Sequence, residues 1–132
     1  MHPYLSDAFC RDVDLSYNTK LRSIDFDFLG LYTIFLGRAH EGLHVPRILA
    51  QITSLSIREV IIRVRMDVAD DLGLLDWSTI ECILERPNYR NLQKLIVSGL
   101  GTGDLLHETK TWLKNTLPGC NARGIIECSS LP

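Results

Sequence analysis

The segment LQKLIV at residues 92–97 decides the fold, because its first, fourth and sixth residues are apolar. The same spacing occurs in LRSIDF at 21–26 and in IREVII at 57–62, and a weaker copy begins at Ala122. The four starts lie 36, 35 and 30 residues apart. Apolar and β-branched residues around each copy predict strands over 21–28, 57–66, 92–98 and 122–128.

Three segments between these strands carry apolar residues at helical spacing. The first helix is expected to begin near Pro46, because proline suits the first helical position. The second is capped by Ser78 or by Asp76 and ends at Pro87, and the third runs over 104–117. The apolar stripes comprise Val45, Ile48, Leu49 and Ile52; Trp77, Ile80, Ile83 and Leu84; and Leu105, Leu106, Thr109, Trp112 and Leu113.

Alternation of strand and helix at a nearly constant period predicts parallel strands joined by right-handed crossovers. The expected fold is α/β: a short leucine-rich-repeat-like solenoid with a four-stranded parallel sheet and helices on one side. A small doubly wound α/β sheet is the alternative, and the even spacing favours the solenoid. With 132 residues, positions 1–132 are expected to form one domain.

Composition excludes several classes of protein. An apolar share of 45% with 23% charged residues is that of an ordinary globular chain, which excludes disorder. A formal charge of −2 argues against a nucleic-acid partner, and the short apolar runs argue against a membrane partner. The N-terminus lacks the pattern of a secretory signal, so an intracellular protein, cytoplasmic or nuclear, is expected.

The four cysteines are predicted to be buried or half-buried free thiols. Cys10, Cys82, Cys120 and Cys128 include no C-x-x-C pair and lie far apart in the sequence. A disulfide framework or a zinc site made of thiolates therefore has little support.

A second set of motifs resembles one family. DWSTI at 76–80 and NLQKLIV at 91–97, with ILERPNY between them, resemble a stretch of the leucine-rich-repeat-like region of mushroom F-box-like proteins. The closing segment of that region is similar to LPGCNARGII at 117–126. The resemblance covers about 76–126 well and 15–66 in rhythm only.

The resemblance implies a non-catalytic scaffold for protein–protein interaction that recruits the target of an F-box-type ubiquitin ligase receptor. These motifs consist mostly of core, cap and turn residues, so they specify a scaffold rather than a chemistry. No F-box segment precedes the repeats in this sequence, so the chain is expected to be a fragment of a longer parent protein. A protein partner of unknown identity is expected, and exposed sheet edges allow a homodimer.

His40, Glu41 and His44 spell the H-E-x-x-H signature of zinc hydrolases, in which two histidines on one helical face bind the metal. A zinc-dependent hydrolase is therefore an alternative function. Gly42 and Pro46 oppose the required helix, because proline disfavours a helical residue before it. We expect no cofactor and no metal, and a surface loop at these histidines.

The loop GLGTGD at 99–104 follows a predicted strand and opens a predicted helix, as a dinucleotide-binding turn would. A nucleotide-binding α/β protein is thus a further alternative. Asp104 occupies the position of the third glycine, where its charge would repel a pyrophosphate. A tight loop that needs positive φ at its glycines is the preferred interpretation.

Alternation along the strands predicts a partner-binding face on the side of the sheet away from the helices. Asp27 is expected beside Arg63 as a cross-strand ion pair, and Trp77 and Trp112 are expected in the core. The inward residues are predicted to be Ile24, Phe26, Phe28, Ile62, Val64, Met66, Leu95 and Val97. The partner-binding residues are predicted to be Asp25, Asp27, Ile61, Arg63, Arg65, Lys94, Ile96 and Ser98.

Overall fold

The computed structural model describes residues 20–30, 44–65, 72–73 and 75–130, and only the backbone at residues 27–30, 44 and 65. In chain order the elements are β1 (Ser23–Gly30), α2 (His44–Gln51), β2 (Glu59–Arg65), α3 (Trp77–Leu84), the 3-10 helix η3 (Pro87–Tyr89), β3 (Lys94–Ser98), α4 (Gly103–Thr116), α5 (Pro118–Arg123) and β4 (Ile126–Ser129). Helices therefore alternate with strands, as the sequence predicts.

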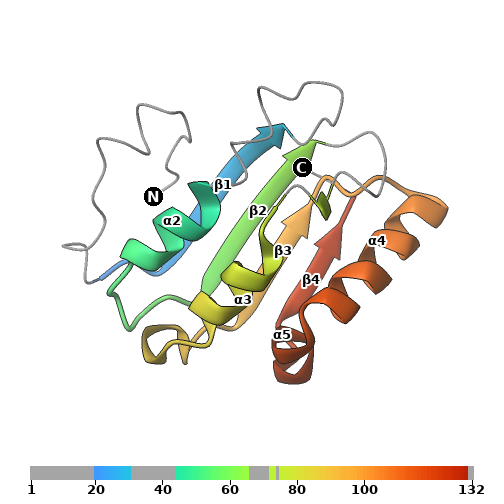
Figure 1. Cartoon of the computed structure of the whole chain (residues 1–132). Coiled ribbons are helices and arrows are strands. Elements are labelled where there is room, and N and C mark those ends of the chain that lie inside the picture. Colours follow the sequence, from blue (N-terminus) through green and yellow to red (C-terminus); the bar gives the residue numbers. More distant parts are fainter. Residues whose placement is uncertain (1–19, 31–43, 66–71, 74, 131–132) are drawn as a thin grey trace.

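The four strands form one parallel sheet in the order β1-β2-β3-β4 (Figure 1). The predicted α/β class with a four-stranded parallel sheet is confirmed. Each strand pairs with the next one in the chain, whereas a doubly wound sheet reverses its strand order at a switch point. The alternative of a doubly wound sheet therefore does not describe these strands.

The register of the first three strands follows the repeated apolar spacing. Ile24 pairs with Val60, and Val60 pairs with Leu95. Phe26, Ile62 and Val97 form the next row, and the side chains of both rows are buried. The spacing predicts this register because every second side chain of a strand faces the core.

The fourth strand differs from the prediction. Ala122 lies in α5, and β4 starts only at Ile126, which pairs with Leu95. The pairing is one residue out of step with the predicted copy. The third helix was expected over 104–117, and α4 does end at Thr116. A separate helix that was not predicted, α5, then begins at Pro118, because a first helical position does not need the N–H that proline lacks. Gly124, with φ of 69°, then ends that helix.

The helices lie on one face of the sheet, toward the viewer in Figure 1. The predicted stripes of the first two helices are buried, as are Thr109 and Leu113 of α4. Trp112 was expected in the core, but 36% of its surface is exposed. Asp76 caps α3, because its carboxylate accepts hydrogen bonds from the Thr79 backbone N–H and hydroxyl.

Hydrogen bonds at the starts of the strands repeat from one strand to the next. The Arg58 N–H donates to the Arg22 carbonyl at 2.8 Å, and the Gln93 N–H donates to the Arg58 carbonyl at 2.7 Å. The donors and acceptors stand one strand apart in each case. The same backbone contact is therefore made twice along the sheet.

Side chains also join the connection before one strand to the connection before the next. Asn88 and Asn91 donate to the carbonyls of Ile52 and Leu55, both at 2.9 Å. The Tyr89 hydroxyl donates to the Leu49 carbonyl. Carbonyls of one connection thus accept hydrogen bonds from side chains of the following connection.

Candidate functional site

The outer face of the sheet, opposite the helices, divides into buried and accessible side chains. Asp25 and Ser98 expose only 3% and 4% of their surfaces, which corrects the expectation that both are accessible to a partner. The side chains of Asp27 and Arg65 lie outside the described residues, as do those of Phe28 and Met66. Of the remaining predicted residues, Ile61, Arg63 and Ile96 are half-buried and Lys94 is exposed.

Arg63 forms an ion pair with Asp25 in which one guanidinium nitrogen contacts both carboxylate oxygens. Its Nε lies 3.0 Å from Oδ1 and 3.1 Å from Oδ2 of the carboxylate. The side chain of Asp25 is 4% exposed and that of Arg63 is 29% exposed. The predicted pair of Arg63 with Asp27 involves a side chain that lies outside the described residues. The register of β1 shifts between Phe26 and Leu29. Such a bulge moves the residues that follow it out of the expected alignment.

The other half of the outer face, on β3 and β4, is more open. Lys94 and Glu127 approach to 3.8 Å, and their side chains are 51% and 55% exposed. The Ser98 hydroxyl is buried and has no hydrogen-bond partner among the described residues. This half therefore combines a loose surface ion pair with one unsatisfied buried hydroxyl.

The glycine loop after β3 is shaped by close packing. Gly99 and Gly101 have φ of 83° and 81°. A Cβ atom on Gly99 would lie 2.1 Å from the Val64 carbonyl oxygen, so no side chain fits there. Both features support the tight-loop interpretation. Asp104 stands in the first turn of α4, where its charge complements the helix dipole.

The H-E-x-x-H segment falls largely outside the described residues. His40 and Glu41 are not described, and His44 begins α2 with its side chain undescribed. Val45 is helical, so the expectation that Pro46 keeps it out of the helix is wrong. Within the described ranges, no group of three or more metal-ligating side chains is found.

Three of the four cysteines are described, and all three are free thiols. Cys120 is buried and Cys128 is half-buried, but Cys82 is exposed, which corrects the prediction for that residue. Burial raises the pKa of the Cys120 thiol to about 11, and burial also raises the pKa of Cys128. Both thiols are therefore poor nucleophiles at neutral pH.

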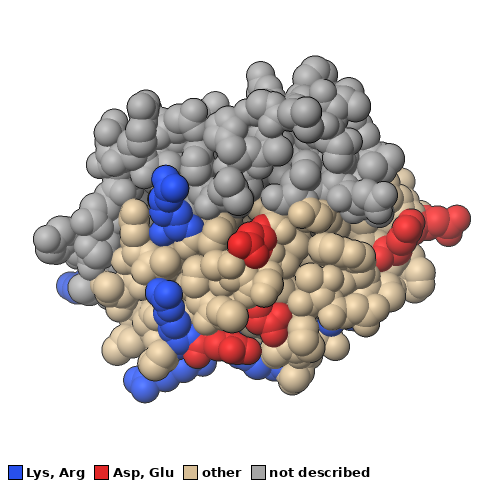
Figure 2. Space-filling view, viewed as in Figure 1, with Lys and Arg blue, Asp and Glu red and all other residues tan. Residues whose placement is uncertain are grey.

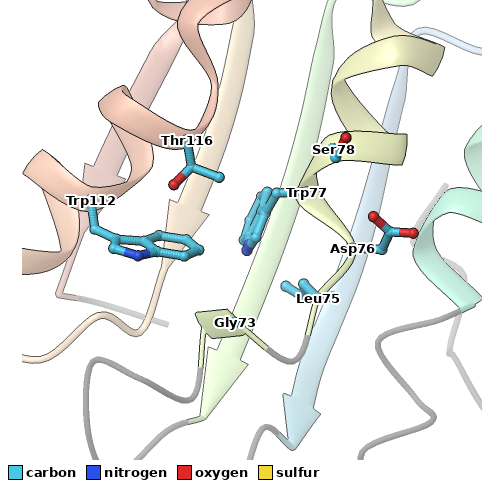
Figure 3. Close-up of a pocket in the computed structure, with 7 residues that line it drawn as sticks. All are labelled: Gly73, Leu75, Asp76, Trp77, Ser78, Trp112 and Thr116. Atoms are coloured by element: carbon cyan, nitrogen blue, oxygen red, sulfur yellow. The ribbon is translucent and has the colours of Figure 1, made fainter.

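Trp112 and Trp77 line an open cavity of about 470 Å³ between α4 and the start of α3 (Figure 3). The Trp77 ring is buried, and its Nε1 donates to the Leu72 carbonyl at 2.8 Å. In Figure 3 the Asp76 carboxylate points away from the space between the two rings. That carboxylate serves the helix cap, so the cavity offers mainly apolar surface.

A second cavity, of about 330 Å³, lies beside η3 and is lined by three arginines. Arg86 and Arg90 flank η3, and Arg123 ends α5. Sequence reasoning missed this group, because the arginines come from segments more than 30 residues apart that meet only when successive strands stack. The one available signal was an arginine on each side of the η3 turn.

Comparisons with known proteins give no relative: no family model, curated protein or solved structure matches this chain. No helix in the described part of the chain is long and apolar enough to span a membrane.

Proposed function

We propose that this chain is part of a leucine-rich-repeat-like solenoid that acts as a non-catalytic scaffold for protein recognition. The partner-binding surface is the accessible part of the outer sheet face, on β3 and β4. It comprises Lys94, Ile96 and Glu127, with Ile61 on the neighbouring strand.

The repeated hydrogen bonds between successive connections carry the proposal. Leu49 and Leu84 stand at equivalent positions of the repeated spacing. The Leu49 carbonyl accepts from Tyr89, and the Leu84 carbonyl accepts from Arg123 at 3.2 Å. Equivalent acceptors served by the following connection are what a stack of similar units requires, since each unit buries itself against its neighbours.

The outer face supports recognition rather than catalysis. Apolar Ile61 and Ile96 pair side by side across β2 and β3, and charged Lys94 and Glu127 lie beside them. An apolar centre next to charges of both signs is suited to a complementary protein surface. Figure 2 views the opposite, helix-bearing side, where acidic side chains are spread over the described surface and basic ones lie mostly at its left and lower part.

The resemblance to mushroom F-box-like proteins suggests the biological setting. In that setting the chain recruits the target of an F-box-type ubiquitin ligase receptor, in the cytoplasm or the nucleus. The parent protein would supply the segment that docks on the ligase. A second copy of the chain, paired through a sheet edge, is the competing partner.

Affinity capture with chemical cross-linking tests the proposal. The wild-type chain is compared with a variant carrying Lys94→Glu and Ile96→Lys, and with Arg47→Glu on the exposed surface of α2 as a matched control. We expect a protein that cross-links to the wild type and the control but not to the double variant. Capture that survives the double change, with all proteins folded by circular dichroism, would refute the proposed surface.

A further inference from the structure

The N-terminal ends of all four strands lie along one edge of the molecule, and this edge carries a marked excess of positive charge. In Figure 2, most Lys and Arg side chains lie at the left and along the lower edge, with acidic side chains among them, and the strands start on this side in Figure 1. The chain as a whole has a formal charge of −2, so this distribution is strongly uneven. The exposed basic residues in the segments that lead into the strands are Lys20, Arg22, Arg58, Arg86, Arg90, Lys94 and Arg123.

The acidic residues near this edge do not neutralise it. The Glu127 carboxylate is paired with the Lys94 ammonium group. Glu85 lines the arginine cavity, but its Oε1 lies 2.8 Å from where a Cβ atom on Gly119 would stand. Its charge is thus directed at the start of α5. In the part of the chain that is described, Arg86, Arg90 and Arg123 form no ion pair with a carboxylate.

The Arg123 side chain lines the cavity and is held in place by hydrogen bonds. Its guanidinium donates to the carbonyls of Leu84, Tyr89 and Leu92 at 3.2, 3.0 and 3.4 Å. Arg86 makes one long contact of 3.4 Å to the Ala50 carbonyl, and Arg90 makes none among the described residues. Two exposed guanidinium groups with few hydrogen bonds to the described residues therefore stand beside an anchored one, around a space of about 330 Å³.

We propose that this cavity is a carboxylate-binding site for an acidic segment of a protein partner. Guanidinium groups pair with carboxylates through two parallel hydrogen bonds, and a partly enclosed site strengthens such pairs. Arg58 and Arg22, on the neighbouring strand starts, would hold further Asp or Glu residues of the same segment. The inference rests on the proposed scaffold function and names the chemistry of its partner.

A protein segment fits this edge better than a nucleic acid does. Tyr89, the aromatic residue nearest the arginines, is fully buried and offers no ring for base stacking. A short acidic segment needs only the few charges that the cavity and its neighbours supply.

Fluorescence anisotropy with a labelled octaglutamate peptide tests the site, and octaglutamine serves as the neutral probe. The variant carries Arg86→Gln and Arg90→Gln, and it keeps Arg123 because that residue holds three carbonyls. We expect octaglutamate to bind the wild type, octaglutamine not to bind, and the double variant to bind about tenfold more weakly. Arg47→Gln, on α2, is the matched control and should leave binding unchanged.

Three results would overturn the inference. They are failure of octaglutamate to bind the wild type, an equal loss with the Arg47 control, and tighter binding of a single-stranded oligonucleotide through the same arginines. The scaffold proposal is judged separately by cross-linking at Lys94 and Ile96. Loss of peptide binding alone would leave that scaffold proposal standing.

Discussion

The two halves of the outer sheet face hold their charges in opposite ways. On β1 and β2, Asp25 and Arg63 form a tight pair at 3.0 Å, with the carboxylate almost fully buried. On β3 and β4, Lys94 and Glu127 approach only to 3.8 Å and remain half in solvent. The first pair is therefore part of the packed structure, and the second is accessible to solvent, as the proposed partner-binding surface requires.

Removing the buried carboxylate should have the largest effect. Asp25→Ala takes away the acidic partner of a half-buried guanidinium, and we expect a loss of about 3 kcal/mol in the free energy of unfolding. Urea denaturation followed by circular dichroism measures this change.

A double variant provides the control for that change. Asp25→Ala combined with Arg63→Met removes both charges, and an apolar pair of similar volume should recover most of the lost stability. A double variant no more stable than Asp25→Ala would mean that packing at these positions, rather than the loss of the ion pair, accounts for the change.

Two buried serines extend the comparison, and they should respond with opposite signs. The Ser54 hydroxyl donates to the Leu21 carbonyl at 2.7 Å and accepts from the Ser56 N–H at 3.0 Å. Ser54→Ala should therefore destabilise the protein by about 1–2 kcal/mol. Ser98→Ala removes a hydroxyl without a described partner, and it should stabilise by about 1 kcal/mol. Thermal and urea unfolding of the two variants would contradict this assignment if both lost stability.

The sequence predicted the parallel sheet and the register of its first three strands because that information is local. Apolar residues at fixed spacing decide which side chains face the core, whatever the connections do. The local spacing did not predict the fourth strand correctly. The 30 residues between the third and fourth copies of the pattern include a second helix, α5, which begins at Pro118. The weak pattern at Ala122 therefore predicted a pairing with β3 that is one residue too early.

The site residues were harder to predict because they depend on contacts across strands. The register of β1 with β2 shifts after Phe26, and Arg63 forms an ion pair with Asp25 that simple alternation did not predict. The alternation of side chains along β3 assigned Ser98 to the outer face of the sheet. A residue on that face can still be buried, and Ser98 is buried. The arginine cavity is assembled by stacking, which no pattern within one segment records.

High pH should destabilise the protein through Cys120, a buried thiol in α5. The folded-state pKa of Cys120 is raised from its ordinary value of 9.0 to about 11, so the unfolded chain loses this proton earlier. The stability that the neutral thiol contributes is complete below pH 9 and is lost as pH rises toward 11. Urea unfolding between pH 8 and pH 10 should show a smaller decline for Cys120→Ala than for the wild type. Equal declines would assign the effect to other groups.

Breaking the exposed pair should have the smallest effect on folding. Lys94→Ala separates two charges that are already about half in solvent, and we expect a change in unfolding free energy of no more than about 0.5 kcal/mol. The same substitution should nevertheless reduce partner cross-linking, because the lysine is one of the charged residues of the proposed surface. A loss of stability as large as that of Asp25→Ala would mean that both halves of the face are structural, and the partner would then have to bind elsewhere.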